Sequence, residues 1–214
     1  MTRRLSSISA IVLSAIEVLV SPASADVELA GLLVDHMVVQ RDRMIPVWGW
    51  AMPGESVSVR FAGQQKTATA DEKGRRRMEL AALPAGGPHE LEAEAGVKVT
   101  VNDVGVGEVW VCSGQSNMAF EFRGVLDAKK EAAEANFPHI RMWHMRYGIA
   151  LEPQERCGSL DGRWVVCSPA SAGSFSAVGY YFARELHRNL GVPIGMIHTS
   201  WGATSAAQWT SSEK

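Results

Sequence analysis

The first part of the chain, from about Val27 to Asp103, consists of short segments in which apolar and polar residues alternate. This period of two is typical of half-buried strands, and no helical period is long enough to compete with it. Turns rich in glycine and proline, such as Pro53-Gly54, separate the segments. The pattern predicts an antiparallel β-sandwich of about eight strands over residues 26–103. The segments that define it are 38–39, 45–48, 57–61, 67–69, 78–80, 89–92 and 97–101.

The pattern changes near Val104, where Gly105 and Gly107 indicate a domain boundary. The residues beyond it alternate between predicted helices and strands, which is typical of an α/β domain. We therefore expect residues 104–214 to form the first part of a domain with a parallel sheet. The predicted elements are a helix at 125–136, strands at 140–145 and 164–167, a helix from Phe175 that Ser174 caps and Gly191 ends, and a strand at 194–198.

One stretch in this second part, GEVWVCSGQSNMAF from Gly107 to Phe120, carries candidate chemistry. Its apolar run, 109–112, predicts a buried parallel strand, because such strands are covered on both faces. The run ends in a small, polar turn at 113–117, at the carboxyl edge of the sheet, where ligands bind in open α/β folds. Ser116 would expose its hydroxyl there as a nucleophile. An ordinary strand-to-helix turn with a capping serine would show the same residues.

A second turn is expected at the same edge. The strand at 194–198 runs into Ser200-Trp201-Gly202, and a helix separates it from the first strand. A strand, a helix and a strand in this order form a right-handed parallel unit. Both turns therefore fall at the carboxyl ends of parallel strands, and we expect them to form one site.

Four stretches of the chain resemble a known family. GQSNM after a GEVW strand resembles the nucleophile block of the SGNH hydrolase superfamily, within it the sialate O-acetylesterase and acetyl xylan esterase group. GMIHTSWGATSAAQW, from Gly195 to Trp209, resembles the second block of that group, and FSAVGYYFARELH, from Phe175 to His187, resembles the intervening helix. The segment from Leu32 to Glu55 resembles the preceding β-domain. The resemblance implies a β-sandwich followed by the first part of a three-layer α/β/α domain.

The resemblance also implies roles for site residues. Ser116 would be the nucleophile, and the backbone N–H groups of Ser116 and Gly202 would bind the oxyanion. Gln115, Asn117, Trp201 and Thr204 would contact the substrate. Ala203 stands where the family has a second glycine, so a positive φ there would cost about 1 kcal/mol.

The catalytic base is not among the matched residues. In the family it comes from an Asp-x-x-His segment near the C-terminus, beyond a QGE block that supplies a third oxyanion donor, and this chain ends at Lys214 before both. We expect each of the six histidines to be structural: His36, His89, His139, His144, His187 and His198. The chain is therefore expected to be the N-terminal part of a longer esterase and to be inactive alone.

The N-terminus and the cysteines bear on location. Arg3 and Arg4, an apolar run at 8–20 and Ala23-Ser24-Ala25 predict a signal peptide cleaved after Ala25, and hence a secreted or periplasmic protein. The apolar run is too short for a stable membrane span. In an oxidising compartment Cys157 and Cys167 could form a disulfide across their turn, and Cys112 would be an inert, buried thiol.

Composition and motifs limit which partners and cofactors the chain is expected to bind. The chain has 21 basic and 23 acidic residues, so its net charge of −2 does not draw it to nucleic acid. No metal or nucleotide motif is present, and we expect no cofactor. The basic run Arg75-Arg76-Arg77 is either a solvated strand edge or an anion contact.

Three functions remain after these observations. The leading hypothesis is a secreted serine esterase that removes acetyl groups from sugar hydroxyls. The alternatives are a non-catalytic carbohydrate-binding or interaction protein and an SGNH esterase of another substrate class. The sequence does not specify which sugar, which hydroxyl or which oligomeric state.

Overall fold

The structure, a computed structural model, describes residues 27–145, 147–156 and 159–211. The predicted signal peptide, residues 1–25, lies outside the described residues. So does Cys157, one partner of the predicted disulfide. No helix among the described residues is long and apolar enough to cross a membrane.

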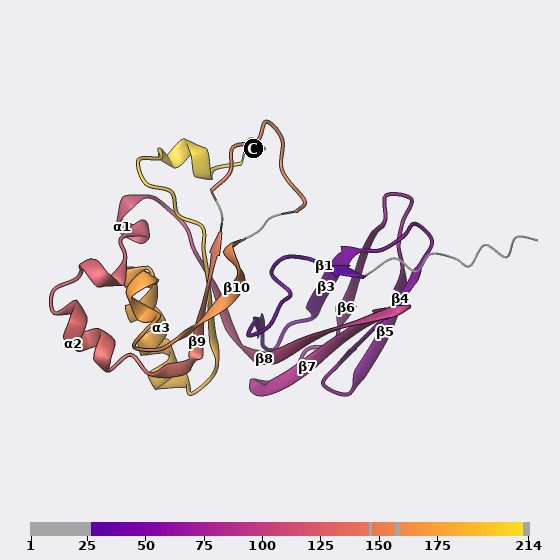
Figure 1. The fold of residues 1–214 in the computed structure, drawn as a ribbon, viewed down its shortest axis with the longest axis horizontal. Helices are drawn as coiled ribbons and strands as arrows, with labels where there is room; N and C mark the ends of the chain where they lie inside the picture. The colour runs from indigo at the N-terminus through magenta and orange to yellow at the C-terminus, as the bar shows by residue number, and fades with distance from the viewer. Residues whose placement is uncertain (1–26, 146, 157–158, 212–214) are drawn as a thin grey trace, which may run out of the picture.

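The described residues form a β-rich fold with a few short helices (Figure 1). The strands are β1 (Glu28–Leu29), β2 (Val38–Gln40), β3 (Ile45–Trp50), β4 (Ser56–Phe61), β5 (Gln64–Thr69), β6 (Arg75–Leu80), β7 (Gly86–Ala95), β8 (Val97–Cys112), β9 (Phe137–Met145), β10 (Ser159–Cys167) and β11 (Ile194–His198). The α-helices are α1 (Ser116–Ala119), α2 (Ala128–Ala133) and α3 (Ala177–Leu190), and the 3-10 helices are η1 (Phe122–Gly124), η2 (Ala172–Ser174) and η3 (Ala206–Trp209).

The strands form two sheets. A three-stranded antiparallel sheet has the order β1-β3-β6, and a larger sheet has the order β10-β9-β11-β8-β7-β4-β5, with β2 beside β8. The larger sheet mixes antiparallel pairs with parallel ones, including β8–β11, β9–β11 and β2–β8. The predicted β-rich, mixed fold is confirmed at this level. The strand pairs within residues 26–103 are antiparallel, whereas β2 pairs in parallel with residues 105–107 of β8, beyond the predicted boundary.

Strand β8 connects the two parts of the molecule (Figure 1). Its first half pairs with β7 in antiparallel orientation, and its end, from Glu108 to Cys112, pairs with β11 in parallel. The predicted domain boundary at residues 103/104 therefore falls inside a continuous strand. The glycines there allow a close approach rather than a break: a Cβ on Gly107 would lie 1.9 Å from the carbonyl oxygen of Pro193.

The end of β8 differs from the buried strand predicted at 109–112. Trp110 and Val111 are 44% and 64% exposed, whereas Cys112 is buried. Among the described strands, β11 alone pairs with this end of β8, because the β2 pairing stops at Gly107. The apolar run predicted burial on both faces, but the neighbouring elements cover only part of it.

Two hydrophobic cores hold the fold together. The first lies between the sheets of the N-terminal part and extends to Trp143 and Trp164. The second lies under α3 and includes Ile140, Met142 and Met196. Successive residues of β9 thus face different cores, Met142 toward the helices and Trp143 toward the N-terminal part. This arrangement explains why the sequence of β9 is apolar on both faces.

Helix α3 packs on the strands that carry the two turns, and its ends follow local rules. Ser176 is the N-cap and its Oγ accepts a hydrogen bond from the Gly179 backbone N–H at 3.1 Å. The predicted cap, Ser174, instead ends η2 and donates to the Ser171 carbonyl oxygen. Gly191 ends α3 at φ 66°, as predicted. The other predicted helix, at 125–136, is shorter than expected and covers only Ala128–Ala133.

Candidate active site

The two turns singled out in the sequence lie side by side. In the parallel pair of β8 and β11, His198 is level with Cys112. Beyond the strands, the Thr199 backbone N–H donates to the Cys112 carbonyl oxygen at 2.9 Å, and the Trp201 N–H donates to the Gly114 carbonyl oxygen at 2.8 Å. Backbone hydrogen bonds therefore continue the register of the sheet into both turns and hold them together.

Ser116 is the first residue of α1 and its side chain is exposed. The turn that leads to it requires Gly114, whose φ of 130° an L-residue rarely adopts. A Cβ built on Gly202 would lie 3.6 Å from Ser116 Oγ. The second turn thus passes beside the hydroxyl, at a spacing where a Cβ at position 202 would be in ordinary van der Waals contact with it.

The other site residues proposed from the resemblance lie in the same two turns as Ser116 and Gly202. Gln115, Asn117 and Trp201 are exposed beside Ser116 and Gly202. Thr204 is already engaged within the protein: its Oγ1 donates to the Trp201 carbonyl oxygen at 2.7 Å and accepts from Trp209 Nε1 at 2.8 Å. Its hydroxyl stabilises the turn that presents Trp201.

Sequence reasoning missed one aromatic neighbour of the site. Tyr147, two residues after β9, lies with its ring centroid 4.8 Å from that of Trp201, and the ring planes are inclined by 32°. Both rings are partly exposed, Tyr147 by 55% and Trp201 by 36%. Only the position of Tyr147 just past the end of a parallel strand could have indicated it.

None of the described histidines is hydrogen-bonded to Ser116. Four make other contacts: His36 with Asp103 at 2.6 Å, His89 with the ring of Phe61, His139 with His187, and His187 with the Val192 carbonyl oxygen at 2.8 Å. The remaining two contact each other, His198 Nδ1 and His144 Nε2 being 3.0 Å apart. The described residues therefore place no histidine in position to accept the Ser116 proton.

His198 is buried, and its imidazole is uncharged at neutral pH. The pKa of its imidazole is lowered to about 4, first by burial and then by the charge of His144, while a hydrogen bond with the Met118 backbone acts in the opposite direction. Its Nε2 lies 2.5 Å from Ser200 Oγ, which is itself only 2% exposed. Both ring nitrogens thus have protein partners.

The cysteines play no visible part in the site. Cys112 and Cys167 have free, buried thiols, and burial raises the pKa of each to about 11. Cys112 is therefore the inert thiol expected from the sequence. The thiol of Cys167 points to the Ala135 carbonyl oxygen at 3.7 Å, and its partner in the predicted disulfide, Cys157, lies outside the described residues.

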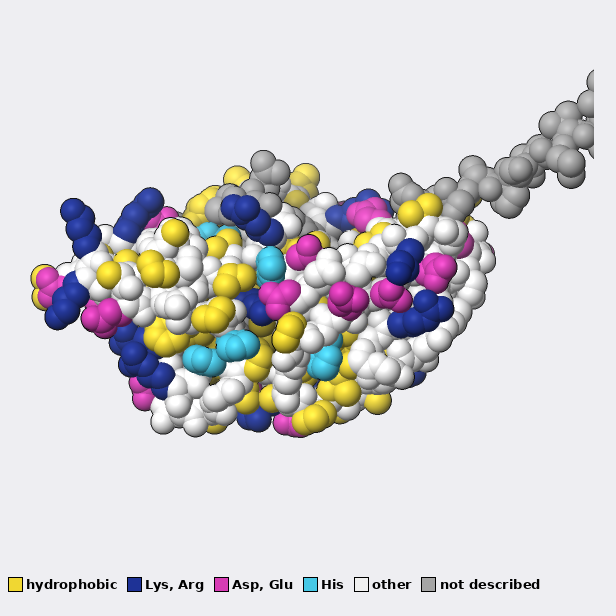
Figure 2. Space-filling view, turned by 60° about the horizontal axis from the view of Figure 1, so that its bottom comes forward, with side chains coloured by type: hydrophobic (Ala, Val, Ile, Leu, Met, Phe, Trp, Pro, Cys, Tyr) yellow, Lys and Arg dark blue, Asp and Glu magenta, His cyan; other side chains and the backbone are white. Residues whose placement is uncertain are grey.

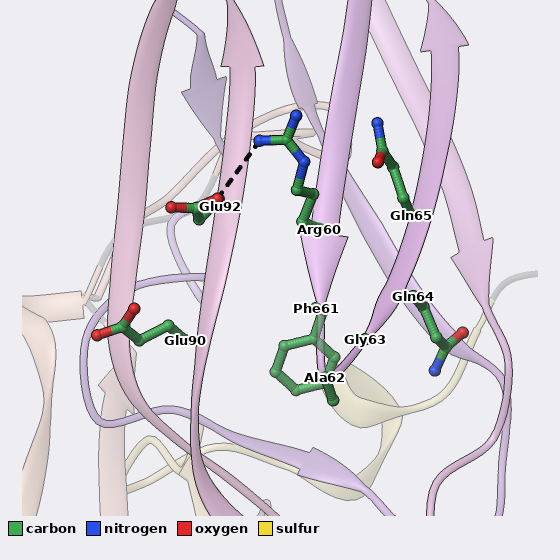
Figure 3. Close-up of a pocket in the computed structure, with 8 residues that line it drawn as sticks. All are labelled: Arg60, Phe61, Ala62, Gly63, Gln64, Gln65, Glu90 and Glu92. Atoms are coloured by element: carbon green, nitrogen blue, oxygen red, sulfur yellow. Dashed lines mark ion pairs between the residues drawn. The ribbon is translucent and has the colours of Figure 1, made fainter.

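On the face seen in Figure 2, Lys and Arg side chains are interspersed with Asp and Glu. The described residues contain no group of three His, Cys, Asp or Glu side chains that could hold a metal ion. A hollow of about 410 Å³ at the β4–β5 turn, with Arg60, Glu90 and Glu92 on its wall, belongs to the N-terminal part and not to the two turns (Figure 3).

Comparisons with known proteins find that the chain is similar to carbohydrate esterases. No protein-family model matches the chain. The solved structure of a carbohydrate acetylesterase from Xanthomonas citri matches it with a TM-score of 0.83 and 38% identity, over 86% of this chain and 43% of that one.

Curated relatives narrow the comparison. Sialate O-acetylesterases from Rattus norvegicus and Homo sapiens are 30% and 28% identical to 85% of this chain. The chain spans 37% and 38% of their lengths. The predicted resemblance to the sialate O-acetylesterase group is therefore confirmed over the part of those proteins that this chain spans.

Proposed function

We propose that this chain carries the nucleophile and part of the oxyanion site of a serine esterase that removes acetyl groups from sugar hydroxyls. The observation that carries the proposal is the proximity of Ser116 and Gly202 at the carboxyl ends of two parallel strands, where a Cβ built on Gly202 would lie 3.6 Å from Ser116 Oγ. The esterase relatives support it, and the names of the curated ones favour an O-acetylated sialic acid as the substrate.

In the proposed reaction, Ser116 Oγ attacks the acetyl carbonyl carbon, and the C–O bond to the sugar breaks. The sugar oxygen leaves with the proton that the serine gave up, and water then cleaves the acetyl-serine to acetate. The backbone N–H groups of Ser116 and Gly202 would stabilise the negative charge on the carbonyl oxygen. Each such donor lowers the barrier by roughly 3 kcal/mol.

The exposed residues around Ser116 would bind the sugar. Gln115 and Asn117 have amide groups that suit sugar hydroxyls, and the indole of Trp201 offers an apolar face to a pyranose ring. Thr204 would act through the turn, because its hydroxyl is bonded to the Trp201 carbonyl oxygen. With the signal peptide predicted at 1–25, we propose that the reaction takes place outside the cytoplasm.

A serine hydroxyl needs a base that accepts its proton. Since no described histidine is hydrogen-bonded to Ser116, the proposal includes slow turnover by the 214-residue chain alone. Oxyanion donors without a base leave about 10³-fold catalysis over water in other serine hydrolases. The chain would therefore react with acyl and phosphonyl reagents slowly but at a specific residue.

The test is covalent labelling with a fluorophosphonate, followed by mass mapping of the labelled peptide. We expect the label on Ser116, its loss in Ser116→Ala, and its retention in Ser113→Ala, which removes an exposed hydroxyl from the same turn. Acetate release from O-acetylated sialic acid and from acetylated xylo-oligosaccharides would then identify the sugar. A label on another residue, or unchanged hydrolysis by Ser116→Ala, would contradict the proposal. Sugar binding without any labelling would favour the non-catalytic alternative.

A further inference from the structure

A network of three hydrogen-bonded side chains, His144, His198 and Ser200, lies beside the candidate active site, and two of them, His198 and Ser200, are buried. It runs from His144 Nε2 to His198 Nδ1, 3.0 Å apart, and from His198 Nε2 to Ser200 Oγ, 2.5 Å apart. His198 is 8% exposed and Ser200 is 2% exposed. The sequence predicted these histidines to be structural and did not predict that they meet.

The network links β9, β11 and the second turn. His144 belongs to β9 and is level with His198 in the parallel pair of β9 and β11. Ser200 lies two residues before Gly202, and the intervening Trp201 N–H is bonded to the Gly114 carbonyl oxygen. A movement of the His198 ring would therefore be passed to both turns.

The contacts hold His198 in one orientation. A neutral imidazole has one donor and one acceptor nitrogen, so partners on both nitrogens specify its tautomer and its ring plane together. Loss of either partner would leave a buried polar group unpaired, which is unfavourable. Because both nitrogens are occupied, His198 is not free to act as the base for Ser116.

We propose that His198 is a positioning residue that, through Ser200, holds the Gly202 backbone beside Ser116 as an oxyanion donor. The inference rests on the roles given above to Ser116 and Gly202. Oxyanion donors act only when they are placed within a few tenths of an ångström of the developing charge, and a misplacement of 1 Å can cost about 10²-fold in rate.

The test compares hydroxyl variants of the 214-residue chain. Ser200→Ala removes the hydroxyl that is bonded to His198, and Ser200→Thr keeps a hydroxyl at that position. Ser171→Ala is the matched control, because the Ser171 hydroxyl is similarly engaged, with the Val166 carbonyl oxygen at 2.6 Å, but lies after β10. We expect Ser200→Ala to slow fluorophosphonate labelling of Ser116 by about 10- to 100-fold. Ser200→Thr should restore most of the rate, and Ser171→Ala should leave it unchanged.

Two further readouts separate positioning from simple stabilisation. Melting temperatures show whether the variants are folded, and a merely structural role would lower them while the folded protein kept its labelling rate. NMR spectra of the chain report the Gly202 amide directly. We expect its resonance to move in Ser200→Ala and in His144→Gln, and to return toward its original position in Ser200→Thr.

The outcomes distinguish this proposal from the proposed function. If the unsubstituted protein is not labelled at Ser116, the proposed function fails. The NMR measurement of the Gly202 amide still tests the network of His144, His198 and Ser200. If Ser116 is labelled at the same rate in Ser200→Ala, or the Gly202 resonance does not move, the positioning role is overturned. A His198 imidazole that titrates with the ordinary pKa of an exposed histidine would overturn it as well.

Discussion

At the scale of single residues, two residues adopt energetically unfavourable states: one has a strained backbone and the other has a buried charge. Ala203, beside the candidate oxyanion donor Gly202, has a φ of 63°. Arg76 is 4% exposed, and its three guanidinium nitrogens have no hydrogen-bond partner. The solvated strand edge considered for the run at 75–77 therefore does not describe Arg76. Both residues should reduce the stability of the folded protein.

The first prediction concerns Ala203. Ala203→Gly should raise the free energy of unfolding by about 0.5–1 kcal/mol, because glycine adopts a positive φ without the steric cost of a Cβ. The same substitution at Ala132, inside α2, should lower it by a similar amount. Urea denaturation of both variants measures the difference. Equal destabilisation by the two would show that Ala203 is not strained.

The second prediction concerns Arg76. Burial lowers the pKa of its guanidinium, so the folded protein binds that proton less tightly than the unfolded chain does. The charge therefore reduces stability at every pH below about 12. Arg76→Met should raise the free energy of unfolding by about 1–2 kcal/mol. Arg77→Met, at the exposed neighbouring position, is the control and should change it little. A marked loss of stability in Arg76→Met would mean that the charge has a partner in solution.

At the scale of elements, the start of α3 is built around Ser176. This serine caps the helix, is fully buried, and places its Oγ 3.5 Å from the sulfur of Met118 in α1. The backbone just after α1 is bonded to the same segment, since the Phe122 N–H donates to the Phe175 carbonyl oxygen and the Ala177 N–H donates to that of Phe120. The helix start therefore supports the element that presents Ser116.

The third prediction tests that support. Ser176→Ala should lower the free energy of unfolding by about 1–2 kcal/mol, because it removes the acceptor of the Gly179 N–H in a buried place. Ser174→Ala, which removes the exposed hydroxyl predicted to be the cap, should have a much smaller effect. Thermal denaturation of the two variants decides between the caps. A larger effect at Ser174 would contradict the assignment.

At the scale of the whole molecule, Arg141 ties the second part of the chain to the first. Its side chain extends from β9, is 4% exposed, and donates from Nη1 to the His36 carbonyl oxygen at 2.9 Å and from Nη2 to Asp103 Oδ1 at 2.9 Å. Asp103 is also paired with His36, whose Nδ1 lies 2.6 Å from Asp103 Oδ2. The continuous strand β8 is the covalent link between the two parts, and this cluster, with Arg141 buried at its centre, is a polar link beside it.

The fourth prediction concerns this cluster. Arg141→Met should lower the free energy of unfolding by about 3 kcal/mol, because backbone carbonyls and a carboxylate lose a buried donor. Arg60→Met, which removes an Arg whose pairs with Glu92 and Glu94 are exposed, is the control and should cost less than about 1 kcal/mol. Similar losses from both variants in urea denaturation would contradict a special role of Arg141.

The cluster also predicts a pH dependence. Burial raises the pKa of Asp103, but the hydrogen bond from His36 and the charge of Arg141 lower it more, so the pKa falls below its ordinary value. A carboxyl whose pKa is lower in the folded protein stabilises it above the unfolded pKa of about 4 and loses that effect as the pH falls through the folded pKa. Asp103→Asn should therefore flatten the loss of stability below about pH 4, measured by thermal denaturation.

The sequence by itself determined the local features of this protein. Alternation located most strands, Gly191 predicted the end of α3, and the small polar residues after two apolar runs predicted the turns that carry Ser116 and Gly202. These features depend on backbone preferences and on side-chain period, which neighbouring residues in the chain specify. The position of the two turns at one sheet edge also followed, because parallel strands share their carboxyl edge.

Only the tertiary structure decided which distant residues meet. The parallel register of β9 and β11 brings His198 against His144, 54 residues earlier in the chain, and the folding of β1 to β8 buries Arg76 and Arg141 while leaving Trp110 exposed. Residue type predicts the opposite burial for these side chains. The burial and the partners of a side chain depend on which other elements pack against it. The hydrophobic pattern of a single helix or strand carries no information about those elements.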